Sequence, residues 1–187
     1  MRLFIITFLS LYAYISFSQN NNRKNRVTNA TRSSFPKSFI GNWKGTLSWT
    51  QPGKLDAQIV NMELRIQPSK DSIGCYTWNL IYGSSSQDNR PYLLKPVDTA
   101  KGHWVIDELN NIVLDQYWIA SRFTGAFTVQ NSTIVNSYWI EEGMLHIEFI
   151  SYNNKPVATT GKGDKESPSV ESYGIRSYQK AVLHKSG

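Results

Sequence analysis

The feature that most constrains the fold is a run of strand-like segments joined by very short connections. Alternating apolar and polar residues define four such segments, at 112–119, 122–130, 133–141 and 144–151. They are separated only by Ala120-Ser121, Asn131-Ser132 and Glu142-Gly143. Two residues can join antiparallel strands, whereas a parallel pair needs a crossover of roughly a dozen residues or more. The middle of the chain is therefore predicted to be an up-and-down antiparallel meander.

The first strand of the folded part is predicted over 39–50, where the alternation has no interruption. Trp43, Gly45, Leu47 and Trp49 share one face, and the other face is polar throughout. This period of two is typical of a strand with one side on a core and one side in water. Further strands are predicted over 57–67, 74–82, 92–97, 103–108 and 172–184. No helix is expected beyond a turn at 35–40.

About ten strands in one domain, residues 39–187, must avoid leaving free edges. Closing the sheet on itself leaves no edge, and sequential hairpins do not require the crossing connections of a sandwich. We therefore predict an all-β fold, a single antiparallel up-and-down β-barrel of about ten strands without substantial helix. No internal repeat suggests another architecture.

The opening strand resembles that of the calycin superfamily, the lipocalin-like β-barrels. Their first strand carries Gly-x-Trp after a short helical turn, which corresponds here to Gly41-Asn42-Trp43 behind residues 36–40. The resemblance implies a barrel closed by a basic residue of the last strand lying across the tryptophan ring. Arg176 is the matching candidate and Lys180 the second, so Gly41, Trp43 and Arg176 are the predicted closure residues.

The N-terminal residues predict export. Met1-Arg2, an apolar run over 3–15 and small residues before Gln19 are typical of a signal peptide spanning 1–18, with cleavage after Ser18. Residues 19–38 are polar and basic and are expected to form a flexible leader. The mature chain is thus predicted to be periplasmic or secreted. It has no second apolar run long enough for a transmembrane helix.

The net charge of +6 lies outside the predicted barrel. All the basic residues before position 39 are unopposed by any acid, and they account for the whole excess: Arg2, Arg23, Lys24, Arg26, Arg32 and Lys37. The barrel itself is neutral, so no nucleic-acid partner is expected. The single cysteine, Cys75, excludes an intrachain disulfide and is interpreted as a packed strand residue.

No metal or cofactor is expected. The sequence has no His-x-His or Cys-x-x-Cys spacing, no Gly-rich phosphate loop and no nucleophile elbow. Haem deserves comparison, because the nitrobindins, which are calycin-like barrels, hold it through a histidine on the last strand. Here that strand offers Tyr178 in its body and His184 close to the chain end, so the resemblance does not extend to haem.

Aromatic residues on the inner faces suggest either a filled barrel or a ligand cavity. Trp43, Trp78, Phe123 and Phe127 are the candidate cavity residues, since barrels of this size hold one small ligand. His146 and Glu148 are further candidates that could anchor a polar ligand group or act as an acid/base pair. The opposite face of their strand is wholly apolar, which favours an outward direction for both.

The segment 153–171 lacks periodicity and is rich in Pro, Gly and charge, so it is predicted to be a long exposed loop. The primary functional hypothesis is binding of a small hydrophobic or amphipathic molecule inside the barrel, without catalysis. One alternative is an interaction module that binds a protein or glycan through its outer surface or this loop. The other alternative is an enzyme with a polar site in the barrel mouth, which requires an inward His146 or Glu148.

Overall fold

The computed structural model describes residues 34–187. The predicted signal peptide, and the leader up to residue 33, lie outside the described residues. The strands are β1 (Gly41–Thr50), β2 (Gln58–Ile66), β3 (Tyr76–Tyr82), β4 (Asp88–Asp98), β5 (His103–Asp107), β6 (Val113–Ile119), β7 (Arg122–Val129), β8 (Ser132–Glu141), β9 (Met144–Thr160) and β10 (Val170–Ser186). Two short 3-10 helices, η1 (Lys37–Phe39) and η2 (Thr99–Lys101), complete the elements, and neither is long and apolar enough to cross a membrane.

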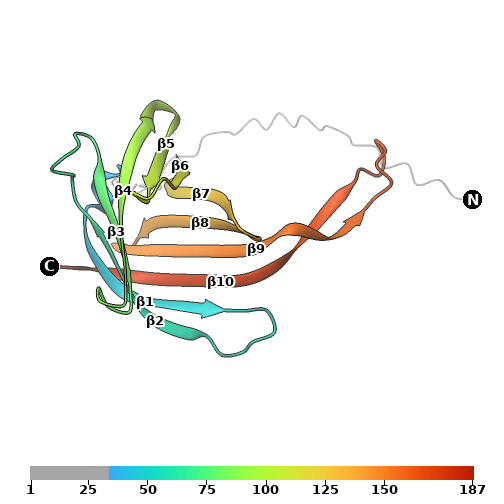
Figure 1. Cartoon of the computed structure of the whole chain (residues 1–187), viewed down its shortest axis with the longest axis horizontal. Coiled ribbons are helices and arrows are strands. Elements are labelled where there is room, and N and C mark those ends of the chain that lie inside the picture. The colour runs from blue at the N-terminus through green and yellow to red at the C-terminus, as the bar shows by residue number, and fades with distance from the viewer. Residues whose placement is uncertain (1–33) are drawn as a thin grey trace, which may run out of the picture. The chain divides into compact units, whose positions relative to one another are not determined.

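The ten strands form one closed antiparallel barrel, which confirms the predicted fold class (Figure 1). Each strand pairs with its neighbours in sequence, and β1 and β10 pair to close the ring. The tight connections arise as the sequence predicts. Ala120 and Ser121 both have positive φ, which the two-residue hairpin between β6 and β7 requires.

Strand alternation places a mainly apolar surface inside the barrel. Trp43 and Leu47 of β1 are buried, and on β9, which is separated from β1 only by β10, Leu145 and Ile147 are fully buried. The odd-numbered residues of β1 and β9 therefore face inward. The core is densest at the end of the barrel where β1 begins and β10 ends.

A small 3-10 turn plugs this end. Phe39 is fully buried, and the Phe35 ring stacks on Phe123 at 4.4 Å and on Trp118 at 5.0 Å between centroids. Trp43 donates a hydrogen bond from Nε1 to the Phe39 carbonyl oxygen at 2.8 Å, which fixes the turn to β1. Residues 34–38 are thus part of the packed domain. The prediction that they belong to the flexible leader is wrong, because the Phe35 side chain completes the core.

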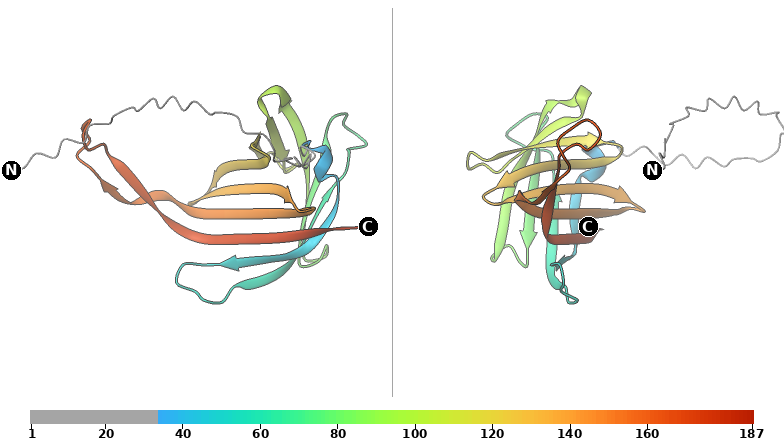
Figure 2. Two further views of the ribbon diagram at one scale, coloured as in Figure 1. Left: turned by 180° about the vertical axis from the view of Figure 1, so that it is seen from behind. Right: turned by 90° about the vertical axis from the view of Figure 1, so that its right-hand side faces the viewer.

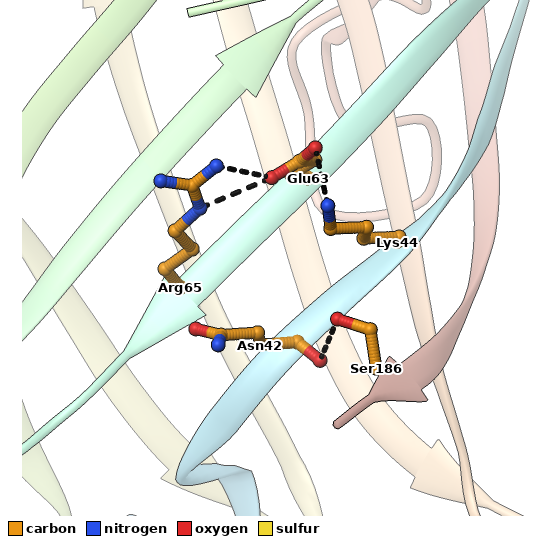
Figure 3. Close-up of polar contacts among 5 residues, drawn as sticks. All are labelled: Asn42, Lys44, Glu63, Arg65 and Ser186. Atoms are coloured by element: carbon orange, nitrogen blue, oxygen red, sulfur yellow. Dashed lines mark hydrogen bonds and ion pairs between the residues drawn. The ribbon is translucent and has the colours of Figure 1, made fainter.

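Polar contacts on the outer face hold β1 to its two neighbours (Figure 3). Glu63 on β2 forms ion pairs with Lys44 at 3.1 Å and with Arg65 at 2.7 Å. Ser186 on β10 donates a hydrogen bond to the Asn42 carbonyl oxygen at 3.2 Å. Burial alone would raise the pKa of Glu63, but the two cations lower it overall. The Glu63 carboxylate therefore remains charged and pairs with Lys44 across the contact between β1 and β2.

The predicted loop over 153–171 is wrong, because most of it is strand. β9 continues to Thr160 and β10 begins at Val170, so only residues 161–169 form the connection between these two strands. The two strands make a twisted ribbon that projects beyond the rest of the barrel (Figures 1 and 2). Register shifts between Ser172 and Ser177 mark where the ribbon leaves the barrel wall. The irregular composition of this segment concealed its pairing, since exposed two-stranded ribbons have no buried face to impose alternation.

Candidate binding site inside the barrel

A cavity of about 360 Å³ occupies the half of the barrel opposite the plug. This volume lies within the range of small-molecule sites, roughly 300 to 1,000 Å³. The lining residues come from the ends of β1, β3, β5 and β7, from the beginnings of β4, β6 and β8, and from the middle of β9 and β10. All of these strand ends meet at the same end of an up-and-down barrel, so the cavity has one mouth and one floor.

The mouth carries charged and hydroxyl groups on two opposite walls. On one wall, Arg176 donates a hydrogen bond to Ser132 Oγ at 2.7 Å, and the hydroxyls of Ser151 and Ser177 are 2.7 Å apart. Arg176 has no ion pair with any carboxylate of the described part of the chain. It is therefore a cation at the cavity entrance whose charge has no carboxylate partner among residues 34–187.

The facing wall presents Arg90, Tyr92 and Glu108. Arg90 is held by Asp88 through two hydrogen bonds of 2.9 and 2.7 Å and lies 4.8 Å from the centre of the Tyr82 ring. The hydrogen bond from Arg90 lowers the pKa of Asp88, so this pair stays ionised and electrically balanced. Burial is the main cause that raises the pKa of Tyr92, and the nearby Glu108 carboxylate raises it further. The Tyr92 hydroxyl therefore stays protonated.

The middle of the cavity is apolar and combines aliphatic with aromatic side chains. Its walls are formed by Trp49, Leu80, Ile106, Leu114, Phe127, Ile134 and Phe149. The indole Nε1 of Trp49 is buried and has no hydrogen-bond partner among the described residues. Aromatic walls with few polar groups are typical of sites that bind small organic molecules.

The floor is polar. Gln116 on β6 and Asn136 on β8 are 0% and 2% exposed and exchange two hydrogen bonds through their amides. The bond from Asn136 Nδ2 to Gln116 Oε1 measures 2.8 Å, and the return bond from Gln116 Nε2 measures 3.3 Å. Tyr138 completes this layer, and burial raises the pKa of its hydroxyl far above the ordinary value. Below the floor lie the buried rings of Trp78 and Phe123.

The four aromatic cavity candidates are divided by this arrangement. Phe127 lines the cavity. Trp43, Trp78 and Phe123 are buried in the closed half of the barrel and do not contact the cavity. They are wrong as cavity residues, because the N-terminal plug fills that half with Phe35 and Phe39. Strand alternation places a residue inside the barrel but does not tell at which depth the interior is empty.

His146 and Glu148 are also wrong as cavity candidates, since both lie on the outer face of β9. His146 stacks on Trp139 with 5.2 Å between ring centres, and Glu148 accepts a hydrogen bond from the Tyr178 hydroxyl at 2.7 Å. The inward positions of this strand are Leu145, Ile147 and Phe149, which agrees with the direction favoured by the sequence pattern. The acid/base pair that the catalytic alternative required is therefore absent from the interior.

Arg176 does not lie over Trp43, so the predicted closure contact is wrong. The cation at that ring is Lys185, whose Nζ is 5.4 Å from the centre of the indole and whose backbone pairs with Trp43. Lys180, the second candidate, pairs with Ser48 and takes no part. Gly41 has a φ of +146°, a conformation that favours glycine, and it begins β1 beside Lys185.

The structure also reveals many lining residues that were not predicted, among them the polar residues Arg90, Glu108, Gln116 and Asn136. Two of them had a detectable signal. Gln116 shares a face with Leu114 and Trp118, and Asn136 shares one with Ile134 and Tyr138. A single amide on an otherwise apolar strand face needs a buried partner. Among residues 34–187 no three His, Cys, Asp or Glu side chains come together in a way that could hold a metal ion.

No family model and no curated protein matches the sequence. Among solved structures, the chain is similar to a protein of unknown function of the DUF3598 family from Nostoc punctiforme, with a TM-score of 0.57 at 12% sequence identity. The match covers 80% of this chain and 48% of that protein, so the chain spans about half the length of its structural neighbour. At this identity the likeness shows the barrel fold alone.

Proposed function

We propose that this protein is an exported lipocalin-like barrel that binds one small amphipathic molecule in its interior, without catalysis. The observation that carries the proposal is the cavity of about 360 Å³, which combines apolar walls with a charged mouth. A barrel that serves only as a scaffold gains stability by filling its interior with side chains, as the plugged half does. The other half remains open and is lined by groups suited to a ligand.

The polar end of the ligand is oriented by Arg176. This guanidinium lies at the mouth beside Ser132 and lacks a carboxylate partner among residues 34–187. The guanidinium fork matches a carboxylate or phosphate through two parallel hydrogen bonds. An anionic group at the mouth therefore satisfies Arg176, while the apolar part of the ligand contacts Phe127 and Phe149.

The test is an equilibrium titration with the aromatic acid naphthalene-2-carboxylate as the probe. Trp49 lines the cavity, so bound probe should quench its fluorescence and give a saturable curve. Leu114→Trp fills the cavity and should abolish binding. Its matched control is Val113→Trp, because Val113 is the adjacent residue on the outer face and is 53% exposed. A Leu114→Trp protein that binds like the wild type would refute an interior site.

Export is tested separately by mass spectrometry of the protein recovered outside the cytoplasm. The proposal predicts a mature chain that begins at Gln19. A full-length N-terminus on the recovered protein would contradict it.

A second candidate function is partner binding by the β9–β10 ribbon. Its projecting part exposes several apolar side chains, namely Val157, Val170, Tyr173 and Ile175. Other exposed apolar side chains are spread over the barrel, but these four lie on one projecting element, which favours an interaction surface. Replacing Val157 and Ile175 with serine should leave probe binding unchanged, and should reduce partner capture only if the ribbon is that surface.

A further inference from the structure

We infer that the floor of the cavity is a subsite that forms hydrogen bonds with a neutral polar group, a hydroxyl or carbonyl, at the inner end of the ligand. This inference rests on the proposed interior binding and narrows its ligand class. The ligand is then a compact aromatic acid with polar groups at both ends. A plain alkyl chain, as in a fatty acid, does not match this site.

The first argument is the hydrogen-bonding capacity that the floor leaves unused. A primary amide has two N–H donors and a carbonyl oxygen with two lone pairs. The exchange between Gln116 and Asn136 uses one donor and one lone pair of each amide. Gln116 therefore keeps one N–H and one lone pair, whereas the Asn136 amide also reaches the Tyr138 hydroxyl, and all three residues line the cavity. Buried polar groups are costly without partners, so an alkyl end placed here would be disfavoured.

The second argument is that the backbone makes room for this pair. Gly125 on β7 lies beside Gln116, and a Cβ added at Gly125 would come within 2.3 Å of Gln116 Nε2. The same Cβ would be 2.6 Å from the Asp115 carbonyl oxygen, which cannot move easily. An amide on β6 can thus extend into the interior because its neighbour on β7 has no side chain.

The third argument is the depth of the site. Ser132, which contacts Arg176 at the mouth, and Asn136 at the floor are four residues apart on β8. At about 3.3 Å per residue, mouth and floor are roughly 13 Å apart. A rigid two-ring molecule with a hydrogen-bonding group at each end matches this distance, and the aromatic walls of the middle layer suit its rings.

The experiment compares two acids that differ in one hydroxyl, naphthalene-2-carboxylate and 6-hydroxynaphthalene-2-carboxylate. In the wild-type protein the hydroxy acid should bind about threefold to tenfold more tightly, which corresponds to one net hydrogen bond. Octanoate serves as the alkyl control and should bind more weakly than either. Dissociation constants are measured by isothermal titration calorimetry.

The double variant Gln116→Met/Asn136→Leu removes both amides and keeps their approximate shapes, so the interior stays packed. It should bind both naphthoates with equal affinity. The single variant Gly125→Ala, which displaces the Gln116 amide, should also reduce the preference. Circular dichroism confirms folding of each variant.

Three results would overturn the inference in different ways. Equal dissociation constants of the two acids for the wild-type protein would reject the subsite while the proposed interior binding remains. Absence of binding by all three probes would reject both. Retention of the preference in the double variant would show that the hydroxyl is read elsewhere, and would also reject the subsite.

Discussion

The plug at the closed end makes a strong prediction about stability. Phe39 is fully buried, contacts Phe35 and Trp118, and its carbonyl oxygen accepts the Trp43 indole hydrogen bond. Removing a buried phenylalanine side chain costs about 3 to 5 kcal/mol, because apolar burial is lost and a cavity remains. Phe39→Ala should therefore lower the free energy of unfolding by about that amount. The corresponding loss in Tm is roughly 6 to 20 °C for a domain of this size.

The assay is urea unfolding followed by tryptophan fluorescence, with Ile59→Ala as the control. Ile59 is a large apolar strand residue that is 62% exposed, and its truncation should change the free energy of unfolding by less than about 0.5 kcal/mol. If Phe39→Ala and Ile59→Ala unfold at midpoints that agree within error, the turn at 35–39 does not complete the core, and the division of the interior into a filled and an open half is wrong.

Three other predictions concern the closure, the alkaline limit and the floor. Lys185→Ala should lower the free energy of unfolding in urea by about 0.5 to 1 kcal/mol, because it removes the cation at Trp43. Arg176→Ala should instead chiefly weaken the binding of naphthalene-2-carboxylate. The opposite pattern would restore Arg176 as the closure residue. Burial raises the pKa of Tyr82 to about 12, above its unfolded value of about 10, so the stabilisation by the neutral Tyr82 hydroxyl is present below about pH 10 and is lost as pH rises toward 12. Between about pH 10 and 12 the urea midpoint of Tyr82→Phe should therefore fall less than that of the wild type. An equal fall of the two midpoints would contradict this prediction. In the amide pair, Asn136→Leu alone should lower the free energy of unfolding by about 1 to 3 kcal/mol, because it leaves the Gln116 amide without its partner. Adding Gln116→Met should recover part of this loss. If the effects of the two single variants simply add in the double variant, the two amides do not interact.

The architecture could be predicted because it is set by local rules. Hairpins of two residues, such as Ala120-Ser121, permit only antiparallel neighbours, and the alternation around Trp43 and Leu47 assigns an inner face. The same rule correctly favoured an outward His146, since Leu145 and Ile147 needed the interior. These inferences depend on neighbours in sequence, which a single chain displays.

The site was harder to predict because it depends on long-range register and on depth. Which cation meets Trp43 is decided by the pairing of β1 with β10, and irregular pairing between Ser172 and Ser177 shifts the ribbon relative to the barrel. The sequence gives no measure of that shift, so Arg176 was placed at the wrong end. The depth of the cavity depends on Phe35, which fills the interior from outside the predicted domain.

The floor illustrates a signal that is present but ambiguous. Gln116 and Asn136 each interrupt an apolar face, yet they are 20 residues apart, and only the folded barrel brings their strands to positions on either side of β7. An isolated polar residue on such a face is compatible with several partners. Gly125 on the intervening strand is the residue that makes this particular pairing possible.

The most direct test of interior binding is a methyl NMR spectrum of isotopically labelled protein titrated with naphthalene-2-carboxylate. Ring currents from bound probe should shift the methyl signals of Ile106, Leu114 and Ile134, which line the cavity, and leave those of Ile59 and Ile175 on the exposed surface unchanged. Shifts confined to Val157 and Ile175 of the ribbon, or no saturable shifts at any of these methyls, would contradict the account.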